Sequence, residues 1–163
     1  DPRKENHPIY KEQKDFYNIH KNMFFEVDKD CDFIESPAED VDYKEWEDVF
    51  DTVFTSPPYF DTEKYSNEDT QSYKKFPNKV DWLEGFLRKT IQNCAYGLKP
   101  KRHLIINIAN VSSFDTLEEE TGNIILSEGF EYIDTFQLTL SKMPGKNLSG
   151  AKKFEPVFLF RKK

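Results

Sequence analysis

The sequence predicts an α/β fold in which parallel strands alternate with helices and the last two strands form an antiparallel pair. Short apolar runs alternate along the chain with longer stretches of helical period. The final two apolar runs are joined by residues 142–150, a connection that suits antiparallel strands. With 163 residues, the chain has the length of one domain that can bury a core, and we expect residues 1–163 to form one.

The first half of the chain predicts one helix and two strands. Residues 9–25 carry apolar side chains at roughly helical spacing. Residues 31–35 predict a short strand that a Ser-Pro pair ends, and acidic residues 39–48 predict a loop or short helix. Residues 50–55 predict a buried strand that a double proline stops.

The second half predicts two helices and three strands. Residues 78–98 form the strongest helical pattern, closed by a glycine and a proline. A second helix is expected over 114–128, with Gly129 just past its end. The expected strands lie at 103–109, 130–140 and 154–161.

Composition excludes several classes of protein. No apolar stretch approaches the ~20 residues of a membrane span and no signal peptide begins the chain, so we expect a soluble, cytoplasmic protein. The two cysteines lack the spacing of a disulfide framework. The three histidines show no metal-ligand spacing, and we expect no metal site.

One segment carries the candidate chemistry: Thr55-Ser56-Pro57-Pro58-Tyr59-Phe60, at the carboxyl end of a buried strand. Ligands of open α/β sheets bind outside such strand ends. Two consecutive prolines fix φ and remove two backbone donors, so the turn is rigid and its carbonyl groups can accept hydrogen bonds. The alternative is a double-proline turn that merely ends a strand; the strand before it and the long aromatic-polar loop after it weigh against that alternative.

These residue types suit a reaction at an amino group of a planar base. Such a nitrogen is a poor nucleophile because its lone pair is delocalised into the ring. Ser56 and the Pro57 carbonyl would accept its two hydrogens and favour a more pyramidal nitrogen, which could attack a methyl sulfonium. Tyr59, which follows Pro58 on the same turn, would stack on the base, and a base in duplex DNA would have to flip out.

At these residues the sequence resembles the amino-directed DNA methyltransferases, whose signature is Asp, Asn or Ser followed by Pro-Pro and Tyr or Phe. Residues 60–66 and 150–160 are similar to the continuation and the seventh strand of that family. The resemblance covers roughly residues 31–163 and implies a Rossmann-like methyltransferase sheet, with strands three to seven present and the first strands missing. It implies S-adenosylmethionine as cofactor, DNA as partner, and methylation of cytosine N4 or adenine N6.

The sequence departs from the family at the cofactor site. The family's glycine-rich turn lets the backbone approach the cofactor closely, whereas the first glycine here is Gly85. We therefore expect the isolated chain to bind S-adenosylmethionine weakly or not at all. By position, the candidate cofactor contacts are Asp1 at the end of the implied second strand, and Ser36, Pro37 and Ala38 after the third, with Glu39 and Asp40 slightly later.

Charge is distributed unevenly, although the net value is −7. Residues 1–98 hold 13 basic and 22 acidic side chains, a balance of −9, and residues 99–163 hold 10 and 8, a balance of +2. A polyanion would therefore meet the C-terminal third. Residues 60–78 and 142–152 would lie around the site, where their aromatic rings either stack on nucleotides or cover the end of the sheet. The candidate nucleic-acid contacts are Phe60, Tyr65, Lys142, Lys146 and Lys152.

Two further hypotheses stay open beside a DNA methyltransferase. One is an inactive binding module that keeps the fold, and the other is a methyltransferase that acts on RNA or on protein glutamine. Without the first strands, the strand at 50–55 would also have a free edge, which must be re-paired, covered or shared with a second copy of the chain.

Overall fold

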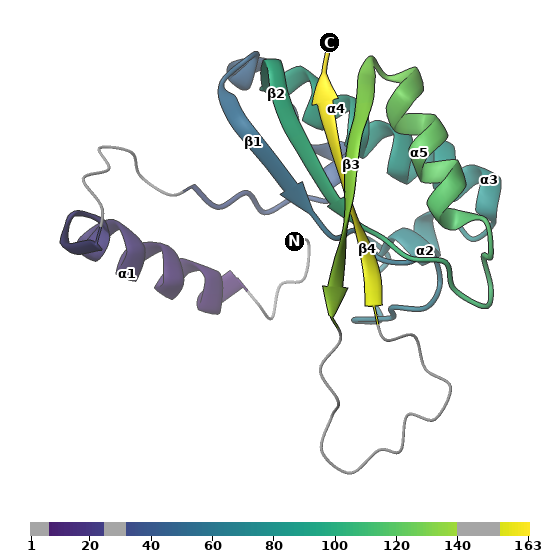
Figure 1. The fold of residues 1–163 in the computed structure, drawn as a ribbon. Coiled ribbons are helices and arrows are strands. Elements are labelled where there is room, and N and C mark those ends of the chain that lie inside the picture. The colour runs from purple at the N-terminus through teal and green to yellow at the C-terminus, as the bar shows by residue number, and fades with distance from the viewer. Residues whose placement is uncertain (1–6, 25–31, 140–153) are drawn as a thin grey trace.

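The computed structural model describes residues 7–24, 32–139 and 154–163 (Figure 1). Its centre is a four-stranded sheet with the order β1-β2-β4-β3. β1 and β2 are parallel, and the pairs β2–β4 and β3–β4 are antiparallel. The strands are β1 (Phe50–Thr55), β2 (Leu98–Asn107), β3 (Phe130–Thr139) and β4 (Phe154–Lys162).

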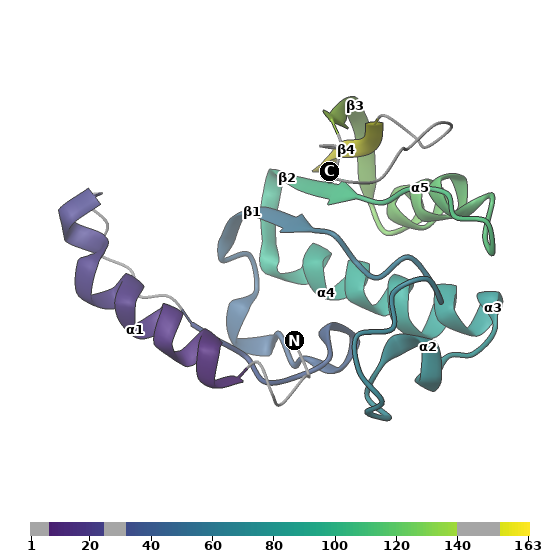
Figure 2. The same ribbon diagram turned by 90° about the horizontal axis from the view of Figure 1, so that it is seen from below.

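Helices cover one face of this sheet. Figure 2 shows α4 and α5 along the same side, and no helix of the described residues covers the other side. The longer helices are α1 (His7–Phe24), α4 (Lys89–Gly97) and α5 (Leu117–Ser127). The short ones are η2 (Ala38–Asp40), η3 (Lys44–Trp46), α2 (Ser72–Lys75), α3 (Lys79–Asp81) and the π-helix η4 (Trp82–Arg88).

The core lies between the sheet and these helices. Leu104 and Ile106 of β2 point into it and are fully buried, because alternate residues of a strand face the same side. Trp82 of η4 and Ile91 of α4 meet them from the helical layer, and both are fully buried as well. Removal of this apolar surface from water supplies the main stabilisation of the fold.

The predicted helix at 78–98 is confirmed, although it has a π-helical middle. It begins at Asn78, whose side-chain Oδ1 accepts a hydrogen bond from the Asp81 backbone N–H at 2.9 Å. α3, η4 and α4 then follow one another without a break. The helix predicted at 114–128 is also confirmed, and Gly129 follows it with φ of +90°, a conformation that favours glycine.

The predicted helix at 9–25 is confirmed as α1, whereas the predicted strand at 31–35 is wrong. Residues 32–35 are not a strand, and Cys31 lies outside the described residues. A strand exists only where a neighbour supplies its hydrogen bonds, and no described strand lies beside this segment. Residues 32–35 instead contact α1, where Nδ1 of His7 lies 3.1 Å from a Glu35 carboxylate oxygen.

Among the described residues, no helix combines the length and the apolar character that a membrane crossing requires. The same residues hold no cluster of three or more His, Cys, Asp or Glu side chains that suits a metal ion.

Candidate functional site

The site is a corner at the carboxyl end of β1. Ser56 follows the last residue of the strand and is exposed, and Pro57 is buried behind it. The Pro58 carbonyl accepts the Phe60 backbone N–H at 3.0 Å, whereas no described residue donates a hydrogen bond to the Pro57 carbonyl. The corner therefore leaves one backbone acceptor open beside the Ser56 hydroxyl.

Phe60 locks the corner to the core. Its φ of +55° lies in the left-handed region, which is strained for a bulky side chain. Its ring is buried and makes edge-to-face contacts with Trp82 and Phe114, at centroid distances of 6.0 and 5.7 Å. This packing holds the strained backbone in place.

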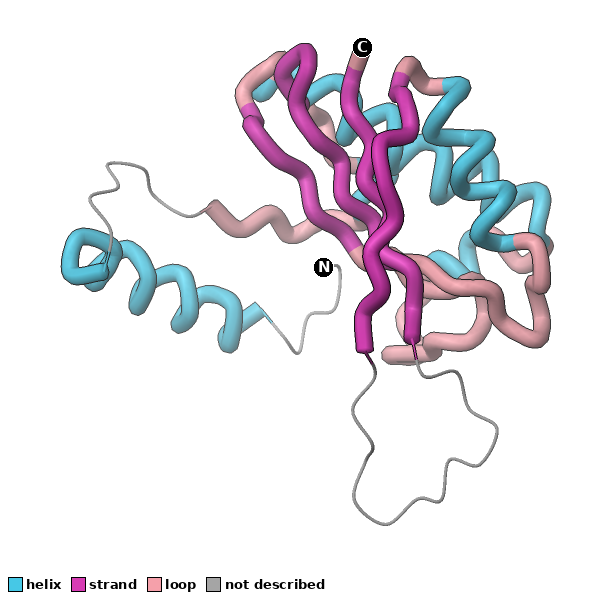
Figure 3. Tube along the Cα trace, viewed as in Figure 1, coloured by secondary structure: helices cyan, strands magenta, loops and turns pink. Residues whose placement is uncertain are grey.

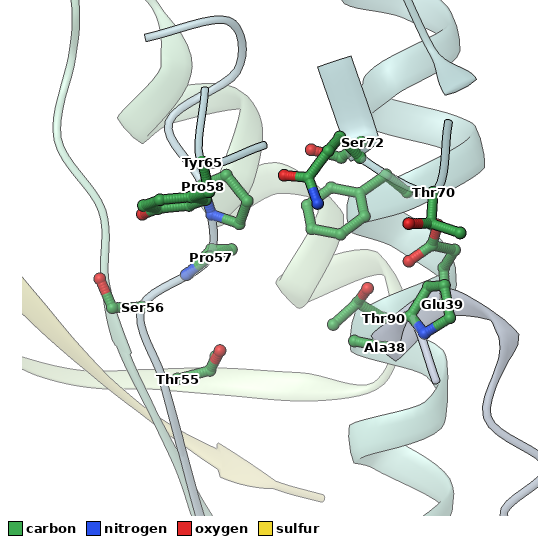
Figure 4. A pocket seen from close by; sticks show the side chains of 13 residues that line it. Ala38, Glu39, Thr55, Ser56, Pro57, Pro58, Tyr65, Thr70, Ser72 and Thr90 are labelled. Carbon is green, nitrogen blue, oxygen red and sulfur yellow. The ribbon is translucent and has the colours of Figure 1, made fainter. Parts of the chain in front are cut away.

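A cleft of about 310 Å³ opens in front of the corner. Figure 4 shows its two sides, with the corner on one side and Glu39 of η2 and Thr90 of α4 on the other. The pink segment between β1 and α2 in Figure 3 supplies further lining. The lining residues are Pro37, Ala38, Glu39, Thr55, Ser56, Pro57, Pro58, Tyr65, Thr70, Gln71, Ser72, Phe86 and Thr90.

Polar groups with unused hydrogen-bonding capacity line the side of the cleft away from the corner. The Glu39 side chain is only 2% exposed, and one of its carboxylate oxygens lies 2.8 Å from Nζ of Lys75. Desolvation favours the neutral lysine, but hydrogen bonds to Asp40 and Glu39 outweigh it and raise the pKa of Lys75. The buried Oγ1 of Thr90 has no hydrogen-bond partner among the described residues. A ligand with polar groups would satisfy such an atom.

Tyr59 joins three segments behind the corner. Its ring is 8% exposed, and its hydroxyl lies 3.1 Å from Oδ1 of Asn107 and 3.1 Å from Oε2 of Glu155. Burial, and then the negative charge of Glu155, raise the pKa of Tyr59. The phenol therefore stays protonated at neutral pH and donates a hydrogen bond.

Asn107 is a site residue that the sequence reasoning missed. It is the last residue of β2 and is 7% exposed. Its Oδ1 also lies 3.4 Å from the Ser56 hydroxyl. A signal was present in the sequence, since Asn107 is the only side chain with an amide in an otherwise apolar strand end.

The structure brings most of the predicted corner and cofactor residues together. Ser56, Pro57 and Pro58 line the cleft, and so do Pro37 and Ala38 from the other side. Ser36 does not line it; its hydroxyl donates to the Pro37 carbonyl at 3.1 Å. Asp1, Lys142, Lys146 and Lys152 lie outside the described residues.

The aromatic residues correct two expectations. Phe60 was predicted to contact nucleic acid, but its ring belongs to the core and is 7% exposed. Tyr59 was expected to stack on a base, but its ring is buried and its hydroxyl holds β2 and β4. Tyr65 is 51% exposed and lines the cleft, so it presents the aromatic surface that the expectation requires.

Comparison with solved structures finds methyltransferases. A candidate DNA modification methylase from Thermus thermophilus has a TM-score of 0.58 at 17% identity, over 78% of this chain and 50% of that one. The same protein complexed with S-adenosyl-L-methionine has a TM-score of 0.52 at 18% identity, with coverages of 78% and 53%. The N-methyltransferase NodS from Bradyrhizobium japonicum, complexed with S-adenosyl-L-homocysteine, has a TM-score of 0.50 at 13% identity, with coverages of 82% and 55%.

These similarities confirm the fold predicted from the sequence, a Rossmann-like methyltransferase fold. The chain spans about half the length of these neighbours. No model of a protein family matches the sequence, and no curated protein matches it either.

The residues of the cleft fit part of S-adenosylmethionine. The orphaned Thr90 hydroxyl and the Glu39 carboxylate suit a ligand that carries amino and hydroxyl groups, such as a nucleoside. The glycine-rich turn that would hold the rest of the cofactor has no counterpart in the described residues, whose first glycine is Gly85.

Proposed function

We propose that this protein takes part in S-adenosylmethionine-dependent methylation of an exocyclic amino group of a DNA base, cytosine N4 or adenine N6. The observation that carries the proposal is the open cleft in front of a rigid corner, which Ser56 and Pro57 line and where no described residue donates a hydrogen bond to the Pro57 carbonyl. A corner packed against other residues would leave no room for a base.

The corner residues have separate roles in this proposal. The Ser56 hydroxyl and the Pro57 carbonyl accept the two hydrogens of the amino group, which draws its lone pair out of the ring. Tyr65 stacks on the base, and such a contact is worth about 1–3 kcal/mol. The two prolines hold these acceptors without the reorganisation that a flexible loop would need.

The cofactor supplies an activated methyl group carried on a positively charged sulfur. In our proposal, Pro37 and Ala38 contact its adenosine part, and Glu39 accepts a hydrogen bond from an amino or hydroxyl group. The buried position of Glu39 strengthens that hydrogen bond, because little water competes for the carboxylate.

We propose DNA as the substrate for two reasons. The corner sequence resembles that of the amino-directed DNA methyltransferases, and a candidate DNA modification methylase is among the structural neighbours. We place the activity in the cytoplasm. Methylation of RNA or protein glutamine, and an inactive binding module, are the alternatives that the experiment must separate.

Methyl transfer from labelled S-adenosylmethionine tests the proposal. The protein encoded by the whole reading frame that contains this sequence is incubated with duplex DNA, with RNA and with protein. We expect label in DNA, and N4-methylcytosine or N6-methyladenine after digestion to nucleosides. Label only in RNA or protein would replace the proposed substrate, and no transfer to any of them would contradict the proposal.

A further inference from the structure

We infer that Asn107 is a positioning residue that makes the Ser56 hydroxyl an acceptor toward the cleft. The inference rests on the proposed function and extends it from β1 to the end of the neighbouring strand. Ser56 follows β1 and Asn107 ends β2, and the two strands are parallel neighbours. The side chains therefore meet at the carboxyl ends of the two strands, where ligands of such folds bind.

The orientation of the Asn107 amide is fixed from the far side. Its Nδ2 donates to the Pro156 carbonyl at 2.9 Å. A carbonyl can only accept, so the NH₂ group must face Pro156 and Oδ1 must face the corner. The side chain is 7% exposed, and the flipped amide would place two acceptors against each other in a buried position.

Two hydroxyl groups approach this one amide oxygen. The Tyr59 hydroxyl lies 3.1 Å from Oδ1, and the Ser56 hydroxyl lies 3.4 Å from it. The Tyr59 hydroxyl also lies 3.1 Å from a Glu155 carboxylate oxygen. A phenol has one proton, and a carboxylate accepts it more strongly than an amide does. Glu155 thus accepts the hydrogen bond from the Tyr59 hydroxyl, and Oδ1 of Asn107 remains available to accept one from Ser56.

The hydroxyl of Ser56 then has a defined polarity. Its single proton faces Oδ1 of Asn107 and the oxygen of Tyr59, which is also a hydrogen-bond partner of Ser56, and its lone pairs are left for the cleft that the residue lines. Lone pairs accept N–H groups, as the amino group of a base requires. Without Asn107, the hydroxyl could rotate and donate its proton into the cleft, which would favour ligands that lack amino hydrogens. A merely structural Asn107 would change the stability of the fold and not this preference.

Nucleoside binding measured by NMR on the 163-residue chain tests the inference without the cofactor. The probes are deoxycytidine and deoxyadenosine, each compared with its N,N-dimethyl analogue, which has no amino hydrogens. We expect the wild-type chain to prefer one amino nucleoside over its analogue by about threefold to tenfold, the effect of one or two hydrogen bonds. Ser56→Ala and Asn107→Ala should each abolish that preference.

The outcomes distinguish failure of the proposed function from failure of the positioning role of Asn107. If the wild-type chain shows no preference, or if Ser56→Ala keeps it, the proposed function fails and the inference fails with it. If Ser56→Ala loses the preference and Asn107→Ala keeps it, only the inference is overturned. Circular dichroism checks that each variant folds, and Asn107→Val, which suits a strand, replaces Asn107→Ala if that variant does not fold.

Discussion

Tyr59 and Tyr65 lie six positions apart in the sequence and occupy opposite environments. Tyr59 is 8% exposed and its hydroxyl lies 3.1 Å from both Asn107 and Glu155, whereas Tyr65 is 51% exposed and lines the cleft. The Ser-Pro-Pro-Tyr pattern draws attention to Tyr59, because burial by distant segments is not visible in sequence. The aromatic ring next to the corner is therefore predictable from sequence, and its role is not.

The environment of Tyr59 predicts an unusual titration. Burial and Glu155 raise its pKa above the ordinary value of 10.0, so it should still be protonated in the folded chain at pH 10.0, where an ordinary tyrosine is half ionised. The tyrosinate absorbance gained up to that pH should be the same for the wild-type chain and for Tyr59→Phe. In urea, where the chain is unfolded, Tyr59→Phe should reduce the absorbance gain by one eighth, because the chain has eight tyrosines. Loss of an eighth in the folded chain would contradict the buried environment.

The same shift fixes the sign of a pH effect on stability. The folded-state pKa of Tyr59 lies above the unfolded value of 10.0. Its contribution to the free energy of unfolding is therefore complete below about pH 10 and falls as the pH rises above it.

At the scale of elements, the continuous helix from α3 to α4 is π-helical in its middle, and an aromatic side chain packs closely against that part. Phe76 precedes the helix and packs against it, and its ring occupies the space where a Cβ atom of residue 85 would lie. Gly85 is the residue that allows this approach. Phe86, the next residue of η4, lines the cleft, so the local geometry of this helix shapes the site.

Substitution of Gly85 tests that packing. Gly85→Ala should lower the free energy of unfolding by about 1–3 kcal/mol, because the Phe76 ring must move. Gly122→Ala in α5 is the matched control, since a Cβ atom there meets nothing within 4 Å. The control should be stabilising by about 0.5–1 kcal/mol, as for alanine in place of a helical glycine. Urea denaturation measures both, and a neutral or stabilising Gly85→Ala would refute the close approach.

Element boundaries were predictable where local signals were strong. The apolar runs at 50–55, 130–140 and 154–161 and the Asn78 helix start agree with the structure to within a residue. β2 begins at Leu98, five residues before the predicted start. Its first half pairs irregularly, with Phe50 opposite Leu98 and Thr52 opposite His103, and Lys101 there has φ of +65°. Such a distorted, charged segment has no strand period for sequence reasoning to detect.

At the scale of the whole molecule, the sheet has one covered face and two edge strands. β1 forms an edge, and among the described residues it pairs only with β2. Phe54 of β1 is 68% exposed, and because successive residues of a strand face opposite sides, it points away from the core against which its neighbour Val53 packs. We propose that a second copy of the chain covers this edge, because unpaired strand edges with apolar side chains favour association.

Sedimentation over a range of concentrations tests this association. The wild-type chain should form dimers or larger species as its concentration rises. Phe54→Lys should shift it toward the monomer, because a charged lysine on an edge opposes pairing. Val80→Lys in α3, whose side chain is as exposed as that of Phe54 but does not lie on a strand, is the matched control and should leave the association unchanged. A wild-type chain that stays monomeric at every concentration would contradict the proposal.

The contacts of the site depend on how the whole sheet is arranged. Tyr59 meets Asn107 and Glu155, which lie 48 and 96 residues later in the chain. They meet because the sheet order places β4 beside β2 and β2 beside β1. The corner itself was predictable from its prolines and its position after a strand, whereas these partners depend on strand order and register, which local sequence does not encode.

The acceptor role that we propose for Ser56 is most directly tested by the kinetics of methyl transfer to DNA. With the protein encoded by the whole reading frame, Ser56→Ala should lower kcat by about 10²–10³-fold, as the loss of one group that stabilises a transition state typically does. KM for DNA should rise by no more than about threefold to tenfold, the effect of one or two hydrogen bonds on binding, so the loss falls mainly on kcat. The exposed Ser112 provides the matched control, and Ser112→Ala should retain full activity. A Ser56→Ala protein with wild-type kcat would contradict the account.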